Sequence, residues 1–303
     1  MNYKLHWRTS CVASCIHAAD VVARGLASTD SSLSSAIGES VHQLTTEVQE
    51  SEIRAEQFWK QLLALSSQTE DVNQLVENTL RDTLKRDSSK DAVSHISLLV
   101  TDIVSAVSKH VGDINELLKL RAVPIRQQWE ARGPGMMSKI TQLSNESLTI
   151  DNATVVLVLP VSGGGGDVHS DQDCVRFEAV LTDTMGQLPE VIRLAWLLSR
   201  LAIRRSRRCS SSPLSRLALV EQLAALPLVL SAADHVELLC FDRSAMDLAV
   251  SSWIHGVEPT ESLSEVVYKW WRGFTGSQTP LTIEMYQLDK TLQNHGAFID
   301  SCE

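Results

Sequence analysis

Apolar residues spaced three or four positions apart recur through the first half of this chain, and this spacing restricts the fold more than any other feature. It places apolar side chains on one face of an α-helix, so each helix must bury that face against a partner. We predict one long helix over residues 33–65, a shorter one over 72–84 and a third, with heptad-like spacing, over 96–118. Together these helices predict an antiparallel bundle within residues 1–132. The apolar positions are Leu33, Ile37, Val41, Leu44, Val48, Phe58, Leu62, Leu65, Val72, Leu75, Val76, Leu80, Leu84, Ile96, Val100, Ile103, Val107, Val111, Ile114 and Leu118.

The character of the sequence changes after residue 150. A β-branched apolar run at 154–159 precedes a glycine tract at 163–166, and an alternating apolar and polar segment follows at 174–181. Such runs, bounded by glycine and proline, are typical of strands. We expect a small β-hairpin or sheet over about residues 154–181. Its first strand should be covered on both faces, and its second should lie at an edge or have one face in solvent.

Helical patterns return toward the C-terminus. Residues 188–203 are apolar nearly all round, which predicts a central buried helix. Pro124 and the Gly133–Pro134 pair should end the N-terminal helices. The fold class predicted is therefore α+β and mainly helical, with a bundle at 1–132 and a domain at 136–303 in which the sheet packs with C-terminal helices. Further helices are expected over residues 136–143, 212–226, 242–254, 263–274 and 280–295.

Charge and hydropathy favour a cytoplasmic protein. The formal net charge is −10, which argues against a whole surface that binds a polyanion. No apolar run of about 18 residues lacks charge, so we expect no membrane span. His17 and Asp20 interrupt the apolar stretch near the N-terminus, which we interpret as a first helix instead of a signal peptide. The six cysteines contain no CxxC pair and are expected to be reduced thiols.

Acidic and imidazole side chains follow the glycine tract and form the candidate metal site. Its candidate ligands are Asp167, His169, Asp171, Asp173 and Glu178. Carboxylates with an imidazole suit a divalent cation such as Ca²⁺, Mg²⁺ or Mn²⁺. Glu178 is twelfth counting from Asp167, as in a calcium-binding loop, but Gln172 stands where that loop needs glycine. A divalent-metal site is one hypothesis; a solvated hairpin tip is the interpretation that the incomplete pattern favours.

Three other patterns have both a ligand-binding and a structural interpretation. Cys11 and Cys15 lie one helical turn apart and could supply half of a zinc site, although packing inside a helix is favoured. The basic run contains Arg200, Arg204, Arg205, Arg207 and Arg208. This run could contact nucleic acid, but it lacks interleaved aromatic residues and sits at the end of an apolar helix, which favours cations. The glycine tract at 163–166 lacks a following Gly-Lys-Ser/Thr, so no nucleotide-binding loop is predicted.

The strand pair followed by a buried helix is similar in layout to zinc-dependent peptidases of the zincin type. In that family the helix carries HExxH, whereas the corresponding residues here are Arg193, Leu194, Ala195, Trp196 and Leu197. Neither zinc nor a catalytic water could be held without the histidines and the glutamate. The similarity implies at most a metal-free scaffold.

No nucleophile signature such as GxSxG or SxxK is present. The leading hypothesis is a non-enzymatic cytoplasmic protein that acts by protein binding or self-association. The heptad-like helices support it, as do the adjacent Trp270 and Trp271, of which one can be buried while the other meets a neighbour or a partner. The alternatives are metal-dependent hydrolysis at residues 167–178 and nucleic-acid binding through the run from Arg200 to Arg208.

Overall fold

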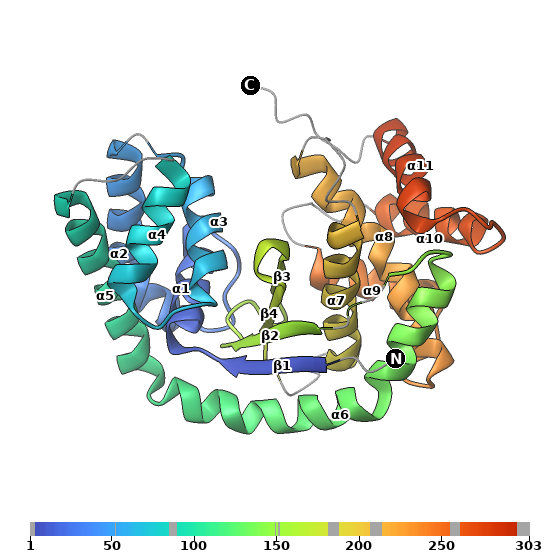
Figure 1. Ribbon diagram of the computed structural model, residues 1–303, viewed down its shortest axis with the longest axis horizontal. Coiled ribbons are helices and arrows are strands. Elements are labelled where there is room, and N and C mark those ends of the chain that lie inside the picture. Colours follow the sequence, from blue (N-terminus) through green and yellow to red (C-terminus); the bar gives the residue numbers. More distant parts are fainter. Residues whose placement is uncertain are drawn as a thin grey trace. The chain divides into compact units, whose positions relative to one another are not determined.

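A computed structural model describes residues 4–51, 53–84, 90–148, 150, 152–180, 188–206, 214–254 and 261–295. These residues form eleven α-helices and a four-stranded mixed sheet (Figure 1). The prediction of a mainly helical α+β fold is therefore confirmed.

The described chain divides into two compact units. The first, here called the sheet unit, consists of His6–Val123 and Thr154–Val180. The second, the C-terminal unit, consists of the described residues of Met1–Leu5, Pro124–Ala153 and Leu181–Glu303. The strand segment thus groups with the N-terminal helices, whereas we expected it to pack with the C-terminal ones. The division into domains at 1–132 and 136–303 stays a prediction.

Five helices belong to the sheet unit, and the apolar stripes predicted from the sequence are buried in them. The helices are α1 (Cys11–Ala23), α2 (Ser31–Glu50), α3 (Ala55–Ser66), α4 (Val72–Leu84) and α5 (Lys90–Val111). The stripe expected on one long helix is shared by α2 and α3. The chain leaves the helix after Glu50, with Ile53 N–H donating to the Val48 carbonyl oxygen, and Arg54 is extended. Apolar Ile53 is itself buried, which explains why the periodic pattern hides this break.

The third predicted helix is also two helices. Helix α5 ends at Val111, and Gly112 follows with a positive φ of 86° that favours glycine. Helix α6 (Ile114–Leu143) then begins, with Asp113 accepting a hydrogen bond from the Glu116 N–H at 3.0 Å.

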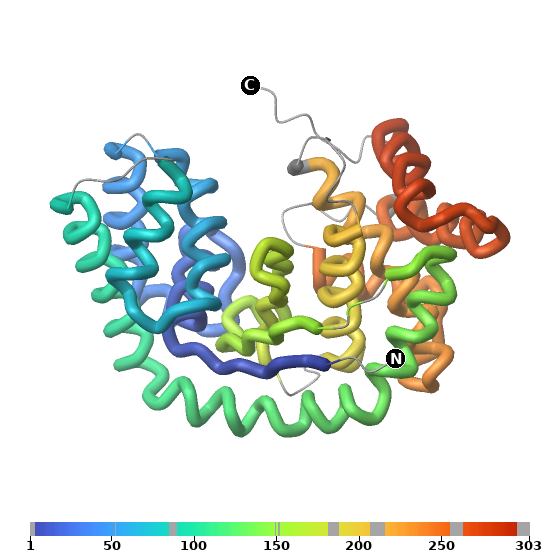
Figure 2. The backbone as a smooth tube through the Cα atoms, viewed as in Figure 1, coloured from blue at the N-terminus to red at the C-terminus, as the bar shows by residue number. Residues whose placement is uncertain are grey.

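Helix α6 continues through both prolines that we expected to end it, and its trace can be followed in green in Figure 2. Each proline removes one backbone donor, while the remaining hydrogen bonds of a 30-residue helix persist. Gly133 is a helical residue and not a C-cap. A Cβ atom at Gly133 would lie 2.4 Å from the ring of Trp129, so glycine lets this buried indole lie against the helix.

The sheet contains β1 (Lys4–Thr9), β2 (Asn152–Val158), β3 (Gly166–His169) and β4 (Cys174–Glu178), in the order β1-β2-β4-β3. Strands β2 and β4 are parallel, so the glycine tract does not join them as the expected hairpin. The hairpin is instead β3–β4, which is antiparallel. All five residues of β4 are buried between its neighbours, so the expected edge position was wrong. Residues 4–9 form a strand where we expected helix.

The C-terminal unit contains α7 (Glu190–Ser206), α8 (Leu214–His235), α9 (Arg243–Trp253), α10 (Glu261–Phe274) and α11 (Leu281–Asn294). Every residue of α7 from Val191 to Ile203 is buried, as predicted. Asp242 caps α9 by accepting a hydrogen bond from the Ala245 N–H. Helix α8 continues through Pro227, where we expected a kink or an end. The expected start of α8 at Ser212 and Pro213 lies outside the described residues.

Two described helices, Lys90–Val111 and Arg216–His235, are long and apolar enough to cross a membrane by length and composition alone. This is weak evidence, because the core helix of a soluble protein passes the same test. The expectation that the chain has no membrane span stays a prediction.

Candidate functional site

The five predicted metal ligands are spread along the β3–β4 hairpin. His169 pairs with Cys174 at one end, near Asp171 in a short 3-10 turn and the left-handed Asp173. Glu178 is the last residue of β4, and its N–H donates to the Gly165 carbonyl oxygen at the other end. Positions 174 and 178 are four residue steps apart along the strand, a distance of about 13 Å. The structure therefore does not bring Glu178 together with the turn residues.

Asp167 lies between these ends, in β3, opposite Arg176 in the register of the hairpin. Within the described part of the chain, no group of three or more His, Cys, Asp or Glu side chains could hold a metal ion. Metal binding at these five positions stays a prediction, and the geometry does not favour it.

The Glu178 carboxylate lies inside the glycine-rich loop. Its Oε1 accepts hydrogen bonds from the Val161 N–H at 3.1 Å, from the Ser162 N–H at 2.8 Å and from the Ser162 hydroxyl at 2.9 Å. Its Oε2 accepts from the Gly164 N–H at 2.7 Å and the Gly165 N–H at 2.8 Å. Successive backbone N–H groups that converge in this way form an anion-binding nest.

Glycine permits the backbone shape of this nest. Gly163 and Gly164 have φ values of 83° and 141°, a region that other residues rarely adopt. The loop does resemble a phosphate cradle in its donors, but the anion it holds is part of the chain itself. The glycine tract that follows β2 without a nucleotide-binding motif therefore serves to bind the buried Glu178 carboxylate.

His17, on α1, completes the site. Its Nε2 lies 2.5 Å from Glu178 Oε1, and both side chains are buried. Because a carboxylate only accepts, Nε2 carries the proton of this bond. The other ring nitrogen, Nδ1, is buried and has no hydrogen-bond partner among the described residues.

The charge on Glu178 is stabilised despite its burial. Burial by itself raises the pKa of the carboxyl, but the hydrogen bonds from His17, Ser162 and Gly165 lower that pKa by more than burial raises it. The net result is a pKa well below the usual range of a glutamate. Glu178 is therefore a charged structural centre whose oxygens are already occupied by hydrogen bonds.

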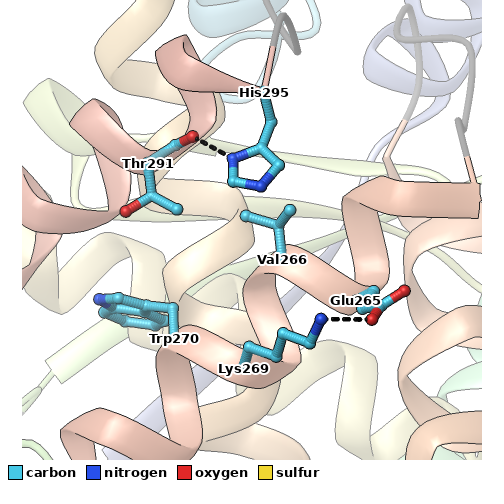
Figure 3. Close-up of a pocket in the computed structure, with 6 residues that line it drawn as sticks. All are labelled: Glu265, Val266, Lys269, Trp270, Thr291 and His295. Carbon is cyan, nitrogen blue, oxygen red and sulfur yellow. Dashed lines mark hydrogen bonds and ion pairs between the residues drawn. The ribbon is translucent and has the colours of Figure 1, made fainter.

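A separate pocket of about 430 Å³ lies between α10 and α11 (Figure 3). It is lined by Glu265, Val266, Lys269, Trp270, Thr291 and His295. The first four residues come from α10, Thr291 lies on α11 and His295 is the C-cap of α11. This volume is in the range of small-ligand sites.

Polar groups around the pocket bond to one another. Lys269 Nζ lies 2.5 Å from Glu265 Oε1, and His295 Nδ1 donates to the Thr291 carbonyl oxygen at 2.8 Å (Figure 3). Val266 and Trp270 supply apolar surface between these pairs. Since the opposite charges of Lys269 and Glu265 offset each other, the pocket suits an apolar group better than an ion.

The two adjacent tryptophans have different environments, as the helical geometry predicted. Trp271 is buried against Phe274, with ring centroids 5.3 Å apart. Trp270 stacks on Phe274 at 5.8 Å and also lines the pocket. The sequence indicated this aromatic cluster, but not the cavity beside it.

The basic run is mostly engaged within the C-terminal unit. Arg200 is buried 4.5 Å over the Trp196 ring and its Nε lies 3.3 Å from Glu221 Oε1. Arg204 Nε contacts the same carboxylate at 2.9 Å, and Arg205 donates to the Asn152 carbonyl oxygen at 3.0 Å. Arg207 and Arg208 lie outside the described residues. The three described arginines therefore do not present a bare cationic surface.

Comparisons with protein families, curated proteins and solved structures found no match to this chain.

Proposed function

We propose that the protein acts by binding a protein partner, without catalysis, and that the pocket between α10 and α11 receives an apolar side chain of that partner. The pocket itself is the observation that carries this proposal. An apolar floor surrounded by polar groups is the arrangement in which anchor residues contribute most to protein interfaces.

Neighbouring surface on α11 supports a protein partner over a small molecule. Ile283 and Tyr286 are 55% and 48% exposed, although both are large apolar side chains. Ile283 lies roughly 80° from Thr291 around α11, so it extends the apolar surface beyond the pocket, whereas Tyr286 lies roughly 140° away and faces another side. A partner that inserts one side chain would thus find further apolar surface on α11.

A pocket-filling variant tests the proposal. Thr291→Phe places a ring at the pocket wall, whereas Thr101→Phe adds the same ring at an exposed position on α5, which does not line the pocket. Partners retained from native lysate by wild type should fall about tenfold with Thr291→Phe and persist with Thr101→Phe, as measured by quantitative mass spectrometry. Equal retention by both variants would contradict the role of the pocket. Monomeric wild type that retains no partner would remove the binding proposal itself.

The metal-dependent alternative has weaker support, because Glu178 is occupied by hydrogen bonds and His169, Asp171 and Asp173 lie at the other end of the hairpin. Elemental analysis of protein purified without chelator tests it. Stoichiometric metal that disappears with His169→Ala would revive this alternative over the binding proposal. Nucleic-acid binding likewise has weaker support, since Arg200 and Arg204 share the Glu221 carboxylate.

A further inference from the structure

Two cysteines lie one turn apart at the start of α1. Cys11 is the first residue of this helix and is partly exposed, whereas Cys15 lies one turn further on and is buried. Ser10 caps the helix, its hydroxyl oxygen accepting from the Ala13 N–H at 2.9 Å. Both thiols are reduced in the structure.

Both sulfur atoms face helix α5. Cys11 Sγ lies 3.7 Å from Ser108 Oγ, and Cys15 Sγ lies 3.8 Å from the Val104 carbonyl oxygen. Val104 and Ser108 are one turn apart on α5, so the two thiols lie in register along one side of α1.

The surroundings give the two thiols opposite character. The side-chain interaction with Cys15 and, after it, the hydrogen bond with Ser108 lower the pKa of Cys11 to about 6. Partial burial and the charges of Glu70 and Asp113 act against this shift without cancelling it. The interaction with Cys11, together with burial, raises the pKa of Cys15. Near neutral pH, Cys11 is therefore mainly a thiolate and Cys15 a thiol, the division expected of an attacking and a resolving cysteine.

We propose that Cys11 and Cys15 form a redox-active dithiol, in which Cys11 is oxidised by hydroperoxides and Cys15 converts the product into an intrahelical disulfide. This proposal is independent of the binding function, which concerns the C-terminal unit. It differs from the half zinc site considered from the sequence because no third ligand group is present among the described residues.

The chemistry needs only the peroxide as co-reactant. The Cys11 thiolate attacks one peroxide oxygen, the O–O bond breaks, and the departing oxygen takes a proton and leaves as an alcohol or water. Sulfur is thereby oxidised to a sulfenic acid while the peroxide is reduced. The Cys15 sulfur then attacks the Cys11 sulfur, the S–S bond forms, and the sulfenic hydroxyl leaves as water with the Cys15 proton.

Closing the disulfide requires a small movement of the helix terminus. Residues four apart on a helix have Cβ atoms about 5–6 Å apart, and a disulfide needs about 3.5–4.5 Å. Cys11 has no helical turn before it, so a shift of the first residue leaves the rest of α1 in place. The oxidised state should therefore loosen the contact between Cys11 and Ser108.

Mass spectrometry can test this directly, because trypsin releases both cysteines in one peptide, residues 9–24. Reduced full-length protein treated with a stoichiometric amount of hydrogen peroxide should yield this peptide lighter by two hydrogens. Cys15→Ser should stop at a sulfenic acid on Cys11 that dimedone traps. Cys11→Ser should leave Cys15 reduced, and Cys240→Ser, which changes an exposed thiol in the C-terminal unit, should leave the reaction unchanged.

The rate of alkylation against pH provides a second readout. With iodoacetamide at pH 6, Cys11 should react roughly tenfold faster than an ordinary exposed thiol such as Cys240, after allowance for the lower nucleophilicity of an acidic thiolate. The profile for Cys11 should have its midpoint near 6. A profile like that of Cys240, or peroxide treatment that oxidises Cys240 first and leaves the 9–24 peptide unchanged, would overturn the proposal.

Discussion

At the scale of single residues, Glu178 shows how a buried charge becomes a structural element. A carboxylate buried without partners would be strongly destabilising. Here four backbone N–H groups, one hydroxyl and one imidazole donate to it. These donors come from α1 and from the loop after β2, so the side chain connects two segments to the end of β4.

We expect Glu178→Gln to destabilise the protein by about 3 kcal/mol, because an amide nitrogen would face backbone donors that it cannot satisfy. Urea denaturation followed by circular dichroism measures the change. Asp171→Asn is the matched control, since Asp171 is exposed and should shift stability by less than about 0.5 kcal/mol. Equal effects of the two substitutions would show that the nest does not contribute.

The low pKa of Glu178 should make the free energy of unfolding depend on pH. Folding lowers the pKa of this carboxyl, so the folded state holds its proton less tightly than the unfolded state. The stabilisation is complete above the unfolded pKa of about 4.3 and is lost by up to about 1.4 kcal/mol per pH unit below it. Measured from pH 7 downward, the stability gap between wild type and Glu178→Gln should therefore narrow only below about pH 4.3. A constant gap down to pH 3 would contradict the low pKa.

At the scale of elements, the same substitution should have opposite effects in two helices. Gly133→Ala in α6 places a Cβ atom 2.4 Å from the buried Trp129 ring and should cost about 1–3 kcal/mol. Gly38→Ala in α2 meets no atom within 4 Å and should stabilise the protein by about 0.5–1 kcal/mol. Thermal unfolding of the two variants compares them directly, and a shift in the same direction for both would contradict the close approach of Trp129.

Periodicity predicted the buried faces of these helices but not where the helices end. The stripe from Leu33 to Leu65 stays in phase across the break at 51–54, because apolar Ile53 fills a core position there. Conversely, Pro124 and Pro134 indicate an end where α6 continues, since a long helix tolerates the loss of single hydrogen bonds. Composition indicated β2 and β4 but not β1 or β3, and the pairing of β2 with β4 depends on contacts that local sequence does not encode.

The sequence predicted only part of the candidate site, again because the site depends on contacts between distant segments. Glu178 was interpreted as a metal ligand because it is twelfth counting from Asp167, as in a calcium-binding loop. Its partner His17 is 161 positions away, so no local spacing could reveal the contact. The pocket between α10 and α11 likewise depends on how two helices pack.

At the scale of the whole molecule, neither compact unit is a continuous stretch of sequence. Ala13 of α1 forms a buried apolar cluster with Val156, Val158 and Cys174 from strands β2 and β4. The N-terminal helices therefore depend on strands that follow them by more than a hundred residues.

We expect a fragment of residues 1–132 to lack cooperative folding, although the sequence suggested this stretch as a domain. Without β2 and β4, it would expose Ala13 and leave His17 without its carboxylate partner. Amide dispersion in NMR spectra and a thermal melt measure the outcome. A longer fragment of residues 1–180 retains both strands and should recover cooperative unfolding. Sharp, cooperative unfolding of the shorter fragment would establish the bundle as self-sufficient.

The bond between His17 and Glu178 also sets an order of events during synthesis. The N-terminal helices leave the ribosome long before residue 178 does. During that time His17 on α1 lacks its hydrogen-bond partner. Joining positions 161 residues apart closes a large loop, which is a late and entropically costly step in folding. The sheet unit can therefore complete its folding only after Glu178 has been synthesised.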